Sequence, residues 1–384
     1  MSRQRLTILV LLLLLTFTAS GALAQETTPT PTAADQTIFL TFVPNIQFSP
    51  FYVALEKGYF SAGGINATLQ YGDEPVGVDL IASNQLQFGS ISGEEVIKAR
   101  ANGRPIVSVY EWFQQYPIGI VVPEGSGIES VKDLAGKKVG IPGRFGASYN
   151  GLTALLAANG LTENDIQLEP IGFNAPDVFC VGGVEAAVVY INNEPLQIQD
   201  RIKAGNCNNY TGVKVFPVSV AADMVSNGIA TNEDTIANHP ELVQGFVTAF
   251  DQAEKDTINN PAEAYLLSVK YVDNLPLPDD FKAALETVAR AQDEFLAGDP
   301  SRQAIADSRA ALLESLSSQF DEATLVQFHV LLNTIDLWDA DQLGFSAEYS
   351  WEITQEILKT MGFVTDPIDL TKAFTNDFLP AAEG

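Results

Sequence analysis

The chain has 384 residues, 46% of them hydrophobic, and its 48 acidic side chains outnumber 21 basic ones for a formal net charge of −27. That hydrophobic content is typical of a folded protein, and the length suggests two domains or one large one. The negative charge disfavours nucleic acid and anionic lipid as partners, and two His and two Cys leave little material for a metal site or a catalytic triad.

The start of the chain has the pattern of a secretory signal peptide. Arg3 and Arg5 precede a mostly apolar run, and small residues follow as far as Ala24. The run is shorter than the roughly 20 residues that span a membrane, so an uncleaved anchor is the less favoured alternative. We expect residues 1–24 to be removed after Ala24, which leaves a soluble protein exported to the periplasm or another extracytoplasmic space. Residues 25–36, rich in Thr and Pro, are expected to form a tether.

The first half of the remaining chain alternates strands and helices. Ser49 followed by Pro50 is typical of a helix start, because Ser caps the first turn and Pro fits its first position. We expect strands at 38–44, 65–72, 86–92, 106–113 and 118–123, and helices at 49–60, 76–85 and 93–103. This βαβαβ order predicts a mainly parallel sheet flanked by helices.

The alternation begins again after residue 130. We expect helices at 131–136 and 147–160, and strands at 137–143, 166–173, 185–191 and from 224 onward. Everything after Asn238 is expected to be helical, with helix starts at 238–241, 260–261, 278–279 and 299–300. The fold class is therefore α/β, with two lobes and a C-terminal helical tail.

The two lobes should be linked by two crossings of the chain. We place the crossings near 121–123 and 221–225, so that lobe 1 comprises 37–121 and 224–384 and lobe 2 comprises 122–223. Ligands of open α/β sheets bind beyond the carboxyl ends of the strands. Two such lobes would form a cleft that closes by a hinge.

Cys180 and Cys207 are the two cysteines of the chain. An exported protein can hold a disulfide, and one that closed this loop would stabilise the fold by roughly 3.5 kcal/mol in the chain-entropy model. Two separate buried thiols are the alternative. Neither case assigns these residues a catalytic role.

Candidate ligand contacts follow the predicted strands of lobe 1. Asn45, Gln47 and Phe48 come after the first strand, where amides could pair with the edge of a heterocycle and Phe48 offers a ring face. Their alternative role is an ordinary capped turn. Ser92 and Glu94 begin a helix after the third strand, and there the helix dipole alone would also favour an acid.

Two aromatic residues and a glycine-rich segment add further candidates. Trp112 and Tyr116 lie near the first crossing, where they could stack on a planar ligand or fill the core between the lobes. Ser148 and Tyr149 belong to the segment GRFGASYNG (143–151), whose backbone N–H groups could hold a phosphate, sulfonate, carboxylate or ring carbonyl. The alternative for this segment is a plain strand–helix turn.

The last candidates follow the strand at 185–191. Tyr190, Asn192, Asn193 and Glu194 form a dense polar set that could bind a ligand edge, although such residues are also common in turns. The two histidines of the chain are expected to be structural. No catalytic residue, metal ligand or cofactor is expected.

Several blocks of the sequence resemble the substrate-binding proteins of ABC importers. They occupy 45–65, 86–96, 130–143, 182–195, 238–250, 350–363 and 369–380, in an order that covers nearly the whole chain after the predicted signal. The likeness is to the thiamine-precursor- and sulfonate-binding branch. Segments 143–151 and 188–195 look most like those of the riboflavin-importer members.

The resemblance implies a two-lobed periplasmic binding protein fold of type II, with a small molecule in the cleft. It also implies a monomer whose partners are an ABC permease and its ATPase. The expected ligand is a planar heteroaromatic vitamin, with riboflavin first and a thiamine pyrimidine precursor or a sulfonate as alternatives. Enzymes of thiamine-pyrimidine synthesis share the fold with a Cys-rich iron motif and an active-site His. Here the two Cys lie far apart in the sequence, which disfavours an enzyme.

Overall fold

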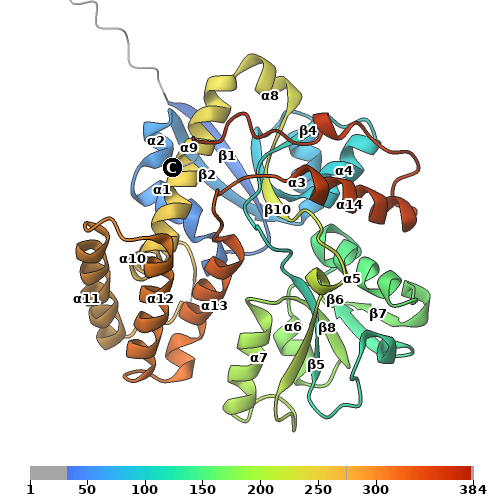
Figure 1. Cartoon of the computed structure of the whole chain (residues 1–384). Coiled ribbons are helices and arrows are strands. Elements are labelled where there is room, and N and C mark those ends of the chain that lie inside the picture. Colours follow the sequence, from blue (N-terminus) through green and yellow to red (C-terminus); the bar gives the residue numbers. More distant parts are fainter. Residues whose placement is uncertain (1–32, 274, 382–384) are drawn as a thin grey trace, which may run out of the picture. The chain divides into compact units, whose positions relative to one another are not determined.

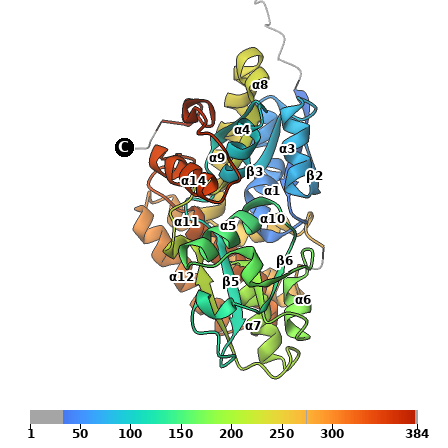
Figure 2. The ribbon, with the colours of Figure 1, turned by 90° about the vertical axis from the view of Figure 1, so that its right-hand side faces the viewer.

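The computed structural model describes residues 33–273 and 275–381. Two five-stranded sheets, each flanked by helices, form two lobes (Figures 1 and 2). The predicted signal peptide and most of the tether lie outside the described residues. Strand β1 begins at Ala34, inside the predicted tether, because it pairs with β2 over eight residues, from Ala34 beside Ile65 to Thr41 beside Gly72.

Lobe 1 is built on the sheet with strand order β2-β1-β3-β10-β4. Its strands are β1 (Ala34–Thr41), β2 (Ile65–Gly72), β3 (Phe88–Ser92), β4 (Ile106–Tyr110) and β10 (Asn227–Asn232). The helices between them are α1 (Ser49–Glu56), α2 (Tyr59–Ala62), α3 (Glu74–Ala82) and α4 (Gly93–Ala101). Strand β10 runs antiparallel to both of its neighbours, whereas β1 pairs in parallel with β2 and β3.

Lobe 2 is built on the sheet with strand order β7-β6-β8-β5-β9. Its strands are β5 (Ile118–Pro123), β6 (Lys138–Ile141), β7 (Gln167–Pro170), β8 (Ala186–Tyr190) and β9 (Val213–Pro217). Its helices are α5 (Gly146–Ala158), α6 (Ala175–Cys180) and α7 (Glu194–Lys203). In each sheet the reversed strand, β5 or β10, is the first one after the chain crosses between lobes. The prediction of mainly parallel sheets is therefore confirmed.

The strand pairing locates the two crossings. Strand β5 pairs with β8 and β9, so the chain reaches lobe 2 between Tyr110 and Ile118, and the predicted boundary at 121 falls inside β5. The return lies between Pro217 and Asn227, which includes the predicted second crossing at 221–225. The exact division of the chain into lobes stays a prediction.

The structure contains three elements of lobe 2 that the sequence did not predict. Helix α7 begins at Glu194-Pro195, where the sequence predicted a polar ligand-binding set with a turn as the alternative. A helix forms here because Pro fits the first turn of a helix. Helix α6 and strand β9 are short, with six and five residues, so their periodic pattern is weak. Cys180 ends α6 and forms a disulfide with Cys207, which follows α7.

The rest of the chain is helical as far as Thr360, as predicted, whereas 361–381 form turns and one short 3-10 helix, η5 (Leu370–Lys372), so the prediction of helix to the end of the chain is wrong there. The helices are α8 (Glu233–Asn238), α9 (Pro240–Asn259), α10 (Pro261–Ser268), α11 (Asp279–Leu296), α12 (Arg302–Ser317), α13 (Glu322–Trp338) and α14 (Glu348–Thr360). Helices α9 to α11 and α13 share one core with α1 and β1, and α14 packs on α4 (Figure 1). Within the described ranges, none of the helices combines the length and apolar character that a membrane span requires.

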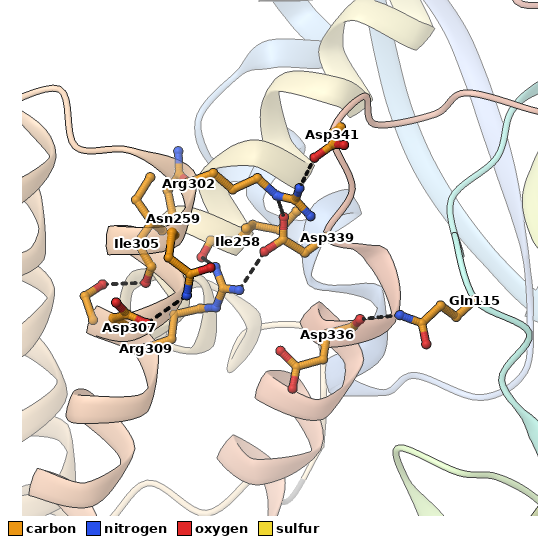
Figure 3. Close-up of polar contacts among 12 residues, drawn as sticks. Gln115, Ile258, Asn259, Arg302, Ile305, Asp307, Arg309, Asp336, Asp339 and Asp341 are labelled. Atoms are coloured by element: carbon orange, nitrogen blue, oxygen red, sulfur yellow. Dashed lines mark hydrogen bonds and ion pairs between the residues drawn. The ribbon is translucent and has the colours of Figure 1, made fainter.

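An ion-pair network fixes the end of α13 (Figure 3). Asp339 caps α13 and accepts from Arg302 at 2.6 Å and from Arg309 at 2.7 Å, both on α12. Arg309 also donates to the carbonyl oxygen of Ile258 on α9 at 3.3 Å. Trp338 precedes Asp339 and stacks on Trp112 with ring centroids 5.4 Å apart. The network thus supports the helix that backs the pocket described next.

Candidate ligand-binding site

A pocket lies between the two lobes, at the ends of their strands. Lobe 1 lines it with residues from the ends of β1 and β4, from η1 (Ile46–Phe48), and from α3, β3 and β10: Thr41, Phe42, Gln47, Phe48, Glu74, Ser90, Trp112, Phe113 and Asn227. Lobe 2 lines it with residues that end or follow β6, β7 and β8: Pro142, Phe145, Gly146, Ala147, Ser148, Gly172, Phe173, Ala175, Val188, Val189, Tyr190 and Glu194. This is the edge at which open α/β sheets hold their ligands.

The predicted candidates that line this pocket come from both lobes. They are Gln47, Phe48, Trp112, Ser148, Tyr190 and Glu194. Their contact with a ligand stays a prediction. The other candidates, Asn45, Ser92, Glu94, Tyr116, Tyr149, Asn192 and Asn193, do not line the pocket, and their hydrogen bonds show what they do instead.

The pocket has aromatic side chains on both sides. In lobe 1, Phe48 and Trp112 have ring centroids 5.8 Å apart. Phe42 of lobe 1 meets Phe173 of lobe 2 edge to face at 4.8 Å, so this pair joins the lobes at the pocket. Such rings can stack on a planar aromatic ligand.

Two acids line the pocket, one from each lobe. Glu74, the first residue of α3, accepts a hydrogen bond from the backbone N–H of Ser92 at 2.6 Å. Burial, followed by the nearby charge of Glu95, raises the pKa of Glu74 to about 8. Burial also raises the pKa of Glu194 to about 7. A carboxyl with such a pKa holds a proton for part of the time at neutral pH, so it can donate as well as accept a hydrogen bond.

Glu94 and Tyr116 connect the lobes behind the pocket wall. The Tyr116 hydroxyl donates to the carboxylate of Glu94 and lies 3.1 Å from the carbonyl oxygen of Ala147. Burial raises the pKa of Glu94 to about 7, and burial and the Glu94 charge raise the pKa of Tyr116. Glu94 and Tyr116 therefore act between the lobes rather than at the pocket surface.

Asn45, Ser92 and Tyr149 have local partners. Asn45 accepts from the backbone N–H of Gln47 at 3.0 Å and so caps η1, which was the alternative role of this turn. Ser92 precedes α4 and binds Glu74 through its backbone. The Tyr149 hydroxyl donates to Glu163 at 2.6 Å, and Arg144 pairs with the same carboxylate at 2.8 Å.

Asn192 and Asn193 position residues of the pocket wall. The Asn192 amide donates to Gln47 Oε1 and to Thr334 Oγ1 of α13, both at 2.7 Å, and thereby joins lobe 2 to lobe 1. Asn193 precedes α7, and its side-chain oxygen accepts from Gln197 at 2.6 Å. Both asparagines are buried.

Some lining residues were missed in the sequence. Glu74 lies just after β2, at a strand end where ligands are expected. It was missed because the predicted helix began at residue 76, two residues after the observed start of α3. Asn227, the first residue of β10, also lines the pocket and accepts from the Tyr190 hydroxyl at 3.3 Å. Phe42, Phe145 and Phe173 gave no signal beyond being aromatic. Among the described residues, no group of three or more His, Cys, Asp or Glu side chains is placed to hold a metal ion.

Comparison with known proteins identifies the family. A family model described as NMT1/THI5 like matches residues 45–264, which is more than half of the chain. The chain belongs to the NMT1/THI5-like family. This confirms the resemblance that the sequence blocks indicated.

One relative is the riboflavin-binding protein RibY of Chloroflexus aurantiacus. It is 33% identical over 356 residues, which cover 91% of this chain and 87% of RibY. A second is the 4-amino-5-hydroxymethyl-2-methylpyrimidine phosphate synthase of Legionella pneumophila, 24% identical over 254 residues, 63% of this chain and 75% of the synthase. The relatives of this chain therefore include a binding protein and a synthase.

A solved structure shows the same fold. The ligand-binding component of an ABC-type import system from Staphylococcus aureus, determined with zinc bound, has a TM-score of 0.59 at 12% identity. The alignment covers 91% of this chain and 99% of that protein. The predicted two-lobed binding-protein fold is confirmed.

Proposed function

We propose that this protein is the extracytoplasmic binding protein of an ABC importer and that it encloses riboflavin between its lobes. The observation that carries the proposal is the aromatic pocket at the strand ends, with Phe48 and Trp112 on one side and Phe173 and Tyr190 on the other. The similarity to RibY over 91% of the chain supports the choice of ligand. The lobes would close on the vitamin and present it to a membrane permease with its ATPase.

The polar residues of the pocket suit the edges of a flavin ring. Such a ring carries carbonyl acceptors, an N–H donor and a chain of hydroxyl groups. Gln47, Ser148 and Asn227 line the pocket and offer both donors and acceptors. Each aromatic contact adds about 0.5–1.5 kcal/mol beyond the burial of the ring area. Binding of this kind needs no chemical step, which agrees with a protein that takes up and releases its ligand.

A thiamine pyrimidine precursor is the second candidate ligand. Two observations favour it: the synthase relatives, and the two acids of the pocket, which could accept from the N–H groups of an aminopyrimidine. A sulfonate would need a cationic partner. Arg144, the basic residue of the segment 143–151, pairs with Glu163 and does not line the pocket, so a sulfonate is less well supported. An enzymatic role would need a catalytic group, and neither His239 nor His329 lines the pocket.

A fluorescence titration of the purified protein with riboflavin tests the proposal. We expect saturable quenching of flavin fluorescence with a Kd in the micromolar range or below. Phe173→Ala should weaken binding about tenfold, because it removes a half-buried ring at the pocket without opening the core. Phe295→Ala, an equivalent change of an exposed ring on α11, should leave the Kd unchanged. Absence of saturable binding would reject riboflavin, and tighter binding of the aminopyrimidine would favour the second candidate.

A further inference from the structure

The charges of the pocket wall narrow the class of ligand, and this inference rests on the function proposed above. Glu74 of lobe 1 and Glu194 of lobe 2 both line the pocket, whereas none of the lining residues is Lys, Arg or His. Lys98, on α4, does not line it and is paired with Glu95 at 2.7 Å. An anionic group inside the pocket would therefore meet acids and find no cationic partner.

The start of α5 is where the wall could otherwise hold an anion. Gly146, Ala147 and Ser148 line the pocket there, and Phe145 at the N-cap supplies no side-chain cap. The N–H of Gly146 already donates to Glu95 Oε1 of the other lobe at 3.2 Å. Glu74 Oε2 lies so close to Gly146 that a Cβ at this position would overlap it. The positive end of the helix dipole thus faces two carboxyl groups of lobe 1.

Helix α7 repeats this arrangement on the other side of the pocket. It begins at Glu194, whose side chain accepts from the backbone N–H of Tyr190 at 2.8 Å. An acid in the first turn is favoured by the same dipole. Helices α5 and α7 both start at the pocket wall of lobe 2. The N-terminus of each is therefore already occupied by a carboxyl group of the protein itself.

We propose that the pocket accepts only ligands without negative charge, and that Glu74 and Glu194 impose this selection. A phosphate or sulfonate in the pocket would be a buried charge without a counter-ion beside carboxyl groups, which is strongly unfavourable. An uncharged ring with carbonyl and N–H groups suits the same carboxyls, which can donate or accept. Riboflavin belongs to this class, and its 5′-phosphate does not.

Titrations with riboflavin and riboflavin 5′-phosphate test the proposal, because the two compounds share the same ring. Wild-type protein should bind riboflavin at least about 30-fold more tightly than the phosphate. In Glu74→Gln/Glu194→Gln this ratio should fall about tenfold or more, mainly through a gain in affinity for the phosphate. The single variants serve if the double variant does not fold. Glu169→Gln, which removes an exposed acid from β7, is the matched control and should keep the wild-type ratio.

The outcomes separate this inference from the proposed function. Equal affinity of wild-type protein for the two flavins, or an unchanged ratio in the glutamine variants, would overturn the inference while leaving riboflavin as the ligand. If neither flavin binds, the proposed function fails. The inference is then tested by comparing the Tm of the wild-type protein in phenyl phosphate with its Tm in chloride at equal ionic strength. A rise in the wild-type Tm would then overturn it, and no rise would support it.

Discussion

Gly146 is the residue at which α5 of lobe 2 meets the carboxyl groups of lobe 1. Its φ of +65° is in the left-handed region, which glycine adopts without steric cost. Glu74 fills the space where a side chain would lie, and Glu95 accepts from its N–H at 3.2 Å. The absence of a side chain is therefore required both by the backbone and by the contact between the lobes.

Gly146→Ala should act on binding as well as on stability. The left-handed backbone alone costs about 1 kcal/mol, and the overlap with Glu74 should in addition weaken riboflavin binding at least about tenfold by opposing closure. Gly160→Ala is the matched control, since Gly160 has a φ of +75° and no atom lies within 4 Å of the position that an alanine methyl group would take. It should lower the free energy of unfolding by a similar amount and leave the Kd unchanged. Equal Kd values for the two variants would contradict the role given to Gly146.

Residue-level reasoning from the sequence led to several residues that line the pocket at strand ends, but it did not separate neighbouring residues from one another. Ser148 and Tyr149 were both expected to contact the ligand, but consecutive helical residues point about 100° apart, so Ser148 lines the pocket while Tyr149 binds Glu163. The hydroxyl of Tyr116, on the first crossing, contacts Glu94 of lobe 1 and the carbonyl oxygen of Ala147 of lobe 2. A single sequence carries no signal for such a pairing.

Among the helices, α12 and α13 are held together by ion pairs that share one carboxylate. Asp339 is the shared partner of Arg302 and Arg309 (Figure 3). The Arg309 side chain is only 7% exposed, so its charge is compensated inside the protein. Gln115 adds a hydrogen bond to the carbonyl oxygen of Asp336 at 3.3 Å, which links α13 to the first crossing.

Asp339→Asn should destabilise the protein by about 3 kcal/mol, because it leaves the Arg309 guanidinium buried without its carboxylate. Asp341→Asn is the matched control: Asp341 also pairs with Arg302 but is fully exposed, so the expected effect is below about 1 kcal/mol. Urea unfolding of the two variants measures both values. If the two variants lose equal stability, the buried network is not what fixes the end of α13.

Some helix starts could be predicted from the sequence, whereas parts of lobe 2 could not. Long helices such as α9 and α11 begin where the sequence predicts, because a proline or acidic residue marks the first turn of each, whereas the start of α13 was not predicted. The start of α7 was missed because Asn193 and Glu194 are equally common in turns. The sheet to which β5 belongs could not be read from the sequence, since its apolar residues fit any buried strand and its pairing with β8 and β9 depends on the path of the chain.

For the molecule as a whole, the buried acids make stability depend on pH. Glu74, Glu94, Glu111 and Glu194 have pKa values raised to about 7 or 8, and burial is the main cause in each. Between the ordinary carboxyl pKa and these values the folded state holds more protons than the unfolded state. The free energy of unfolding should therefore fall as the pH rises from about 5 to 8.

Melting temperatures across this pH range check the expectation. The Tm of the ligand-free protein should fall as the pH rises, and less steeply in Glu74→Gln/Glu194→Gln, where two of the titrating groups are absent. Carboxyls with lowered pKa values, such as Glu163, stay ionised throughout this range and do not alter the slope. Parallel profiles for wild type and the double variant would show that Glu74 and Glu194 titrate alike in the folded and unfolded states.

We expect the pocket between the lobes to select riboflavin from a mixture of candidate ligands. Native mass spectrometry of the purified protein, after incubation with equimolar riboflavin, riboflavin 5′-phosphate, an aminopyrimidine thiamine precursor and an alkanesulfonate, measures which of them it binds. We predict one riboflavin bound per chain, with the signal reduced in Phe173→Ala and retained in Phe295→Ala. Preferential capture of any other member of the mixture, or riboflavin bound equally by both variants, would contradict the account.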